Sequence, residues 1–240
     1  RRGDLEHLAL SASTGELAAW LGPRLGGVIG QLVRPVTVWA RRDVIGVGLA
    51  AEGAALAFEL LWAPIGSDAR FVVADARGVG LGGPALAHAL RAVDTAIGGI
   101  AERRGRIVEI EQVGRLLGRA VLPRVGARAP AARRVRFGEL GVGEQRLEVE
   151  LDASILPPVF SVEAARWLEL GELVADADAD LVRGQLDAAR DRYLAALEQA
   201  PRHPEIARLI ADIDLAIGGR EEAALGEFLD ASLELFILVR

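Results

Sequence analysis

Three aspartates alternate with alanine in one short stretch, an arrangement in which carboxylates could bind a cation. They are Asp176, Asp178 and Asp180. A calcium-binding loop needs glycine at its sixth position and glutamate at its twelfth, where this chain has Leu181 and Asp187. The calcium-loop pattern therefore fails, and we expect no metal site. On a helix the same aspartates would form a solvated edge, with Asp178 pointing outward.

Three glycines offer a second possible chemistry, the binding of a phosphate. Gly78, Gly80 and Gly83 have the G-x-G-x-x-G spacing between an expected strand and an expected helix, the order of a dinucleotide-binding fingerprint. However, Asp75 and Arg77 directly precede them, where a central parallel strand should be apolar. We expect these glycines to serve a tight turn and close strand packing, with nucleotide binding as the less favoured alternative.

Other catalytic groups are scarce. His7, His88 and His203 are far apart in the sequence, and no serine lies in a nucleophile-elbow sequence. His88 falls on the polar side of its expected helix, where we expect a solvated imidazole. The chain has no cysteine, which excludes thiol nucleophiles and cysteine-ligated metals. We expect a protein that is not an enzyme and that has no cofactor.

Charge and composition divide the chain near its only diproline. Residues 1–160 carry 20 arginines against 17 acidic residues, whereas residues 161–240 carry 8 against 17. Diproline disfavours both a continuing helix and a central strand. We expect a domain boundary at Pro157-Pro158, with an α+β domain at 1–158 and a helical one at 159–240. Every apolar run is interrupted before reaching ~18 residues, so no transmembrane helix is predicted.

The chain also lacks lysine, asparagine and methionine. This bias is typical of a GC-rich genome, and the missing methionine suggests an excerpt of a longer chain. The sequence leaves the compartment open, with a periplasmic or membrane-associated location favoured over a cytoplasmic one.

The acidic part has the residue spacing of stacked helical hairpins. A turn glycine, a small residue at a helix contact, an aromatic residue and a closing proline follow one another, and parts of the pattern return about 35 residues later. These positions are Gly184, Ala189, Tyr193 and Pro201, then Gly218, Ala224 and Phe228.

From about residue 162 onward this pattern resembles the tetratricopeptide-repeat family. Trp167 and Gly171 fit the signature of its first helix. The interval from Val174 to Gly184 is about six residues longer than in the family, so either the first helix is extended or Trp167 belongs to a separate helix. The resemblance implies a groove for a protein or peptide. About three units are usually needed for stability, so we expect the two visible units to pack on the N-terminal domain, an oligomer mate or, as the favoured choice, further repeats.

In the first domain, residues 43–66 predict a β-hairpin with a two-residue turn at Glu52-Gly53. This turn places six large apolar residues on one face, in the pairs Ile45 with Leu60, Val47 with Phe58, and Leu49 with Leu56. We expect this face to meet a helix or a ligand. Alternating patterns predict further strands at 69–77, 133–140 and 146–151, and apolar stripes predict helices at 15–30, 84–100 and 111–122.

Strands with helices on one face predict an α+β fold around an antiparallel sheet. Residues 1 to about 156 resemble the tubular lipid-binding (TULIP-like) domains, in which a curved sheet wraps a long helix. The resemblance implies an apolar groove. Its candidate lining residues are Ile45, Val47, Leu49, Leu56, Phe58, Leu60, Leu86 and Leu90.

Residues 101–136 carry ten arginines against three acidic residues. They could bind anionic lipid headgroups or dock internally on the acidic helices, although a solvated loop is the default. No aromatic residue is available there for base stacking, so we expect no nucleic-acid partner. The candidate surface cations are Arg103, Arg104, Arg106, Arg133, Arg134 and Arg136.

Together these patterns predict a non-enzymatic binding protein. Its α+β domain would bind an apolar ligand or a membrane surface, and its helical repeats would recruit a protein. The alternative is a purely structural assembly protein without a small-molecule ligand. Either could be oligomeric.

Overall fold

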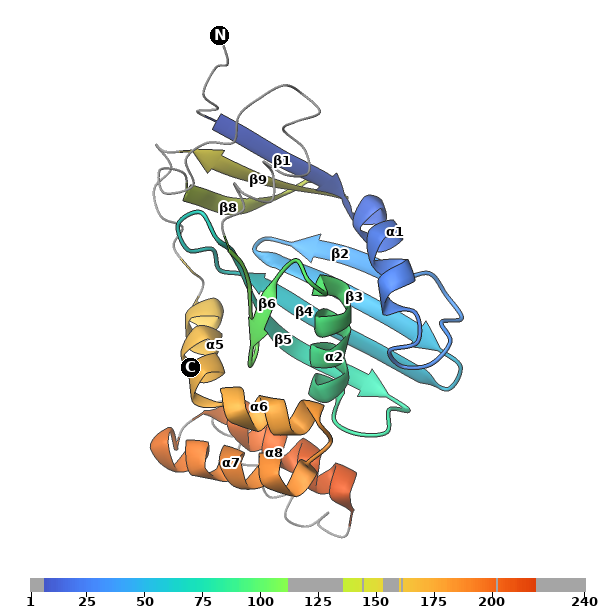
Figure 1. The fold of residues 1–240 in the computed structure, drawn as a ribbon, viewed down its shortest axis with the longest axis vertical. Coiled ribbons are helices and arrows are strands. Elements are labelled where there is room, and N and C mark those ends of the chain that lie inside the picture. The colour runs from blue at the N-terminus through green and yellow to red at the C-terminus, as the bar shows by residue number, and fades with distance from the viewer. Residues whose placement is uncertain are drawn as a thin grey trace, which may run out of the picture.

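A computed structural model describes residues 7–111, 136–143, 145–152, 160, 162–201 and 203–218. These residues form an α+β fold of two antiparallel sheets followed by a helical region, which confirms the predicted class. Figure 1 shows the smaller sheet at one end of the molecule, the larger sheet in the middle and the C-terminal helices at the other end. No helix in the described ranges combines the length and the apolarity needed to cross a membrane.

The smaller sheet brings the start of the chain beside strands from its middle. Its strand order is β1-β9-β8. β8 and β9 pair with each other and correspond to the strands predicted at 133–140 and 146–151. The bounds are β1 (His7–Ser13), β8 (Arg136–Gly143) and β9 (Arg146–Asp152).

The larger sheet is antiparallel throughout, in the order β2-β3-β4-β5-β7-β6. Its bounds are β2 (Thr37–Arg41), β3 (Val44–Ala51), β4 (Ala54–Trp62), β5 (Ala69–Val79), β6 (Glu102–Arg104) and β7 (Ile107–Ile110).

The predicted hairpin register is confirmed. β3 and β4 place Ile45 opposite Leu60, Val47 opposite Phe58, and Leu49 opposite Leu56. The small residues on the other face also have a structural reason. Trp39 on β2 pairs with Gly46 on β3, and a Cβ atom at Gly46 would come within 1.9 Å of the Trp39 indole ring. Glycine is therefore required there so that the ring can lie flat on the strand.

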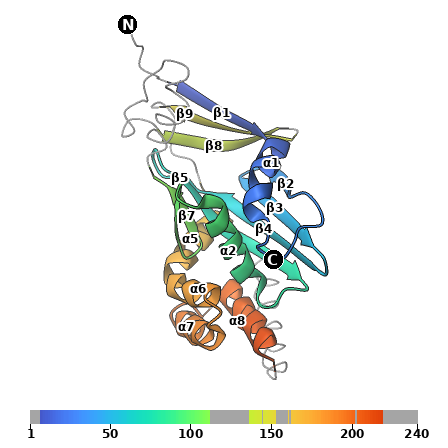
Figure 2. The same ribbon diagram turned by 45° about the vertical axis from the view of Figure 1, so that its right-hand side comes forward.

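Two helices cover the same face of the larger sheet: α1 (Thr14–Leu25) and α2 (Ala85–Ile97) (Figures 1 and 2). α1 begins with a capping box, in which the Ser13 hydroxyl accepts from the Glu16 N–H and the Glu16 carboxylate accepts from the Ser13 N–H. In α2, Pro84 precedes the first helical residue, and the predicted apolar stripe is buried. The helix predicted at 111–122 lies almost wholly outside the described residues.

The glycines before α2 act as turn and packing residues, as expected. Gly80 has a φ of 66°, and a Cβ atom there would lie 1.9 Å from the carbonyl oxygen of Gly53. The strand before them, β5, pairs only in antiparallel fashion within the described sheets. A dinucleotide fingerprint requires a parallel sheet at this point, so that interpretation of the glycine spacing is wrong.

The C-terminal region contains four helices among the described residues: α5 (Val162–Leu173), α6 (Ala175–Val182), α7 (Leu186–Gln199) and α8 (Pro204–Ile217). The chain leaves helical geometry at Val174, so Trp167 belongs to a separate helix and the extended-helix alternative is wrong. α7 packs against both α6 and α8.

These helices share one continuous hydrophobic core with the larger sheet. α6 packs against α2, and α5 packs against β5. Contact is closest at Gly105, where an added Cβ atom would lie 3.0 Å from the Gly171 carbonyl oxygen and 2.9 Å from Ala175 Cα. The N-terminal part of the chain therefore serves as a packing partner for the helices. Pro157-Pro158, the predicted boundary, lies outside the described residues.

A buried ion pair joins the two regions. Arg106, in the turn between β6 and β7, donates from Nε and Nη2 to the Asp178 carboxylate at 3.1 and 3.2 Å. Both side chains are inaccessible to solvent, with exposed fractions of 1% and 0%. The Tyr193 hydroxyl also donates to Asp178, and the Trp167 ring lies 4.7 Å from the guanidinium carbon.

The ionisation of this cluster follows from its burial. Burial is the largest single effect and would lower the pKa of Arg106, but the charges of and hydrogen bonds to Asp178 and Tyr193 together outweigh it, and the pKa is raised above its usual value. Burial, followed by the Asp178 charge, raises the pKa of Tyr193 well above its ordinary value. Arg106 and Asp178 thus form a paired cation and anion, with neutral Tyr193 as a third hydrogen-bonding group.

The ion pair corrects two predictions. Asp178 does not point outward, because α6 is packed between α7 and the β6–β7 turn. Asp180 is also buried, with Arg183 and Arg192 each 2.7 Å away. The first aspartate of the run, Asp176, is exposed as expected, at 88%.

We predict that Asp178→Ala lowers the free energy of unfolding by about 3–5 kcal/mol, because it leaves Arg106 buried without a counter-ion. Asp176→Ala is the matched control, two residues away on the same helix, and should change stability by no more than about 0.5 kcal/mol. Urea unfolding of both variants measures the difference. Equal losses in the two would contradict the buried pair.

Candidate functional site

A wholly apolar cavity of about 270 Å³ lies between α1, α2 and the facing side of the larger sheet. We call it the inner cavity. The sheet contributes side chains from β2 to β7, and the two helices contribute theirs from the opposite side. The lining residues are Leu17, Trp20, Leu21, Leu25, Val38, Ile45, Val47, Phe58, Leu60, Phe71, Val93, Ala96, Ile97, Ile100, Val108 and Ile110.

A second cavity of about 350 Å³, the outer cavity, lies between the two sheets. Both cavities are lined by Leu17, Ile45, Phe71 and Ile110, so they are neighbours separated only by these side chains. We refer to the pair as the apolar groove. The outer cavity is lined by Leu10, Ser11, Ala12, Leu17, Ile45, Trp62, Ala69, Phe71, Ile110, Phe137, Leu140, Leu147 and Val149.

Trp62 fixes the smaller sheet at the outer cavity. Its ring contacts Phe71 and Phe137 at centroid separations of 4.9 and 5.2 Å. Its indole N–H donates to the Gly138 carbonyl of β8 at 2.9 Å. The two sheets are thus joined by aromatic contacts and a hydrogen bond while leaving apolar space beside them.

The inner cavity has apolar side chains that are partly exposed to solvent. Trp20 on α1 and Ile100 after α2 keep 41% and 42% of their surface exposed. The Arg24 guanidinium lies 4.1 Å above the Trp20 ring and donates to the Trp20 carbonyl. A cation is therefore held beside the indole of a cavity-lining residue.

The groove has little capacity for catalysis. None of the described residues that line the groove is charged. Ser11 is the one among them that carries a hydroxyl group. Such a lining offers no general acid, base or metal ligand, and burying an ionic group there without a partner would be costly. The described lining therefore suits hydrocarbon better than an ionic group.

Half of the predicted groove residues line it. Ile45, Val47, Phe58 and Leu60 all face the inner cavity. The other four are instead packed in the closed core, because α2 lies directly on β4 and β5 at that end of the hairpin. These four residues are Leu49, Leu56, Leu86 and Leu90, which are 0–5% exposed.

Of the predicted surface arginines that the structure describes, two are used in packing contacts and two are exposed. Arg106 is buried, as described above, and Arg103 is bound to both oxygens of Asp94 at 2.6 Å with 10% of its side chain exposed. Neither is a free surface cation, because each is used to hold elements together. Arg104 and Arg136 are exposed. The other two candidates, Arg133 and Arg134, lie outside the described residues.

The residues of the repeat pattern occupy packing positions. Gly184 forms the turn between α6 and α7 with a φ of 76°, and Gly171 packs against Ile107 of β7. Pro201 follows α7, and Gly218 ends α8. Fully buried helix contacts are made by Trp167, Ala189 and Tyr193. The predicted second-unit residues Ala224 and Phe228 lie outside the described residues.

His88 and His203 lie in separate surroundings. His88 is half-buried rather than solvated; its Nδ1 accepts from Arg91 at 3.0 Å, and burial followed by the Arg91 charge lowers its pKa. His203 lies 3.5 Å from Glu205 in the turn before α8. No group of three or more potential metal ligands occurs among the residues that the structure describes.

Comparisons with protein-family models, with curated protein sequences and with solved structures found no significant match to this chain.

We predict opposite responses to one substitution at two alanines of α2. Ala96→Phe places its ring in the inner cavity and should change the free energy of unfolding by less than about 1 kcal/mol. Ala89→Phe should cost about 1–3 kcal/mol or more, because Ala89 is fully buried in packed core. Chemical denaturation measures both. A loss at Ala96 as large as that at Ala89 would show that the cavity is filled.

Proposed function

We propose that the chain is a binding protein whose apolar groove holds the aliphatic chain of a lipid-like ligand. The observation that carries the proposal is the pair of adjoining cavities, which together lack a charged lining residue among those described. A binding site for a polar metabolite would instead place several polar groups on its ligand.

The size of the groove suits a chain of moderate length. Small-molecule sites usually measure ~300–1,000 Å³. The outer cavity, at about 350 Å³, falls within this range, and the inner cavity, at about 270 Å³, lies just below it. Burial of a methylene contributes about 0.8 kcal/mol, so roughly ten methylenes would contribute on the order of 8 kcal/mol. This gain is comparable to the cost of association, ~4–15 kcal/mol.

The polar end of such a ligand would lie beside Trp20 and Ile100, where the inner cavity meets solvent-exposed surface. Arg24 is positioned there by its contact with the indole. A guanidinium is suited to an acidic headgroup such as a carboxylate or a phosphate. We therefore favour an anionic lipid-like molecule over a neutral hydrocarbon.

The finer classification of the two regions belongs to the same proposal. Two helices laid over a sheet, with an apolar groove between them, support the resemblance to the tubular lipid-binding domains. The turn glycine at Gly184 and the buried contacts at Ala189 and Tyr193 support the resemblance to a tetratricopeptide hairpin. On this view the helical region presents a surface to a protein partner, while its other side is packed on the sheet.

The proposal predicts that purified protein carries a co-purified lipid-like molecule, or binds added fatty acid, as seen by native mass spectrometry. Ala96→Phe should lower the bound fraction by about tenfold or more, because its ring occupies the space of several methylenes. Thr95→Phe is the matched control, since Thr95 is exposed on the same helix, and it should bind like the natural chain.

Two results would contradict the proposal. One is protein that stays free of ligand when incubated with fatty acids of several lengths, which would favour the alternative of a purely structural assembly protein. The other is equal binding by both phenylalanine variants, which would place the ligand elsewhere. Attachment to vesicles without an extractable one-to-one complex would assign a membrane surface as the partner.

A further inference from the structure

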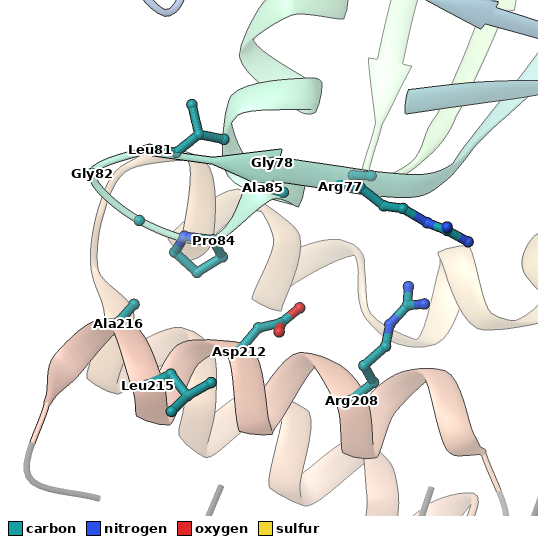
Figure 3. A pocket seen from close by; sticks show the side chains of 12 residues that line it. Arg77, Gly78, Leu81, Gly82, Pro84, Ala85, Arg208, Asp212, Leu215 and Ala216 are labelled. Atoms are coloured by element: carbon teal, nitrogen blue, oxygen red, sulfur yellow. The ribbon is translucent and has the colours of Figure 1, made fainter. Parts of the chain in front are cut away.

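A larger pocket, with no lining residue in common with the groove, lies between the turn before α2 and the helix α8. Its volume is about 680 Å³. Figure 3 shows the glycine turn and the start of α2 on one side and three successive turns of α8 on the other. The pocket therefore exists only where the helical region packs against the sheet domain.

Two arginines converge on one side of this pocket. Arg77 extends from the end of β5, and Arg208 extends toward it from α8 (Figure 3). Arg208 has Asp75 at 4.0 Å, the outer limit of an ion pair. Within the part of the chain that the structure describes, the Arg77 side chain makes no hydrogen bond or ion pair, and the residue is exposed. Two weakly compensated cations that face the same space favour an anionic group between them.

A carboxylate faces the same pocket. Asp212 lies one helical turn after Arg208, with its side chain directed into the space (Figure 3). Among the described residues it has no hydrogen-bond or ion-pair partner. Burial raises the pKa of Asp212, although the charge of Arg208 opposes the shift. A partly desolvated carboxylate of this kind is stabilised by a cationic ligand group.

The remaining wall suits an aliphatic side chain. Leu81 and Leu215 line the pocket beside Pro84, and Leu215 leaves 49% of its surface exposed. The first turn of α2, which begins at the pocket with Ala85, has no side-chain cap, and its Ala87 N–H donates to the Pro84 carbonyl at 3.1 Å. The N-terminus of a helix adds to the attraction for an anion.

We propose that this pocket binds a small zwitterionic compound, an α-amino acid with an aliphatic side chain. The carboxylate lies between Arg77 and Arg208, the ammonium group pairs with Asp212, and the side chain contacts Pro84 and Leu215.

A simple anion fits the pocket less well. Phosphate would satisfy the two arginines but would leave the Asp212 carboxylate unpaired and would be repelled by it. A zwitterion satisfies all three charges at once. Leucine is therefore the appropriate probe, and N-acetyl-leucine and leucinamide are its matched analogues that lack the ammonium group and the carboxylate, respectively.

The test is isothermal titration calorimetry of the full chain with these three compounds and with inorganic phosphate. We expect leucine to bind at least about tenfold more tightly than either analogue, because each analogue loses one charge-assisted contact. Dileucine, in which a peptide bond separates the ammonium group from the carboxylate, should bind more weakly than leucine. Tighter binding of dileucine would contradict a single amino acid as the ligand.

Variants separate the two contacts. Asp212→Asn should weaken leucine by about tenfold while leaving N-acetyl-leucine unchanged, and Arg77→Ala should weaken both compounds but not leucinamide. Asp191→Asn on α7 and Arg104→Ala on β6 make the same chemical changes at exposed positions outside the pocket and should bind like the natural chain.

Three further results would overturn the proposal. They are the absence of leucine binding throughout the millimolar range, leucine affinity that is the same in Asp212→Asn as in the natural chain, and phosphate or a nucleotide binding more tightly than leucine. The last result would assign an anion site at the glycine turn. Unchanged thermal unfolding of Asp212→Asn and Arg77→Ala shows that each variant remains folded during the titration.

Discussion

The ion pair between Arg106 and Asp178 is the interaction on which the arrangement of the two regions depends. Withdrawing a guanidinium and a carboxylate from water costs several kcal/mol for each ion, and this cost is offset only when the partners meet with good geometry. Asp178 accepts from Arg106 and from Tyr193, and Trp167 covers the guanidinium. A packing of the helices that kept these charges buried but apart would leave them unpaired, so the pair favours the observed docking position.

That docking position determines which surfaces remain available for ligands. α2 lies between the helical region and the sheet face, and it contributes to both proposed sites. Its C-terminal end, with Ala96 and Ile97, lines the inner cavity, and its N-terminal end, with Ala85, lines the pocket that faces α8. The helical region completes the second site and leaves the first one open beside α1. The chain thus presents an apolar site and a charged site at opposite ends of one helix.

The sequence predicts local structure here better than it predicts which distant side chains meet. The register of the β3–β4 hairpin followed from alternation and a two-residue turn, and four of its six large residues line the cavity. Arg106 and Asp178 are 72 residues apart, and no local pattern distinguishes an aspartate that meets a buried arginine from one that meets water. The contribution of α1 to the groove was not predicted, for the same reason. The apolar residues of this segment predicted a helix, but they did not predict which surface Leu17 and Trp20 would contact.

The central claim is that the space between α1, α2 and the larger sheet holds a hydrocarbon chain. A crystal structure of the full chain grown with a brominated fatty acid tests it most directly, because anomalous scattering locates the bromine atom without reference to the protein model. The account predicts a bromine peak in van der Waals contact with inner-cavity residues such as Val47, Phe58 and Ala96, with the carboxylate near Arg24. An inner cavity occupied by the protein's own side chains, with bromine found only on the outer surface, would contradict it.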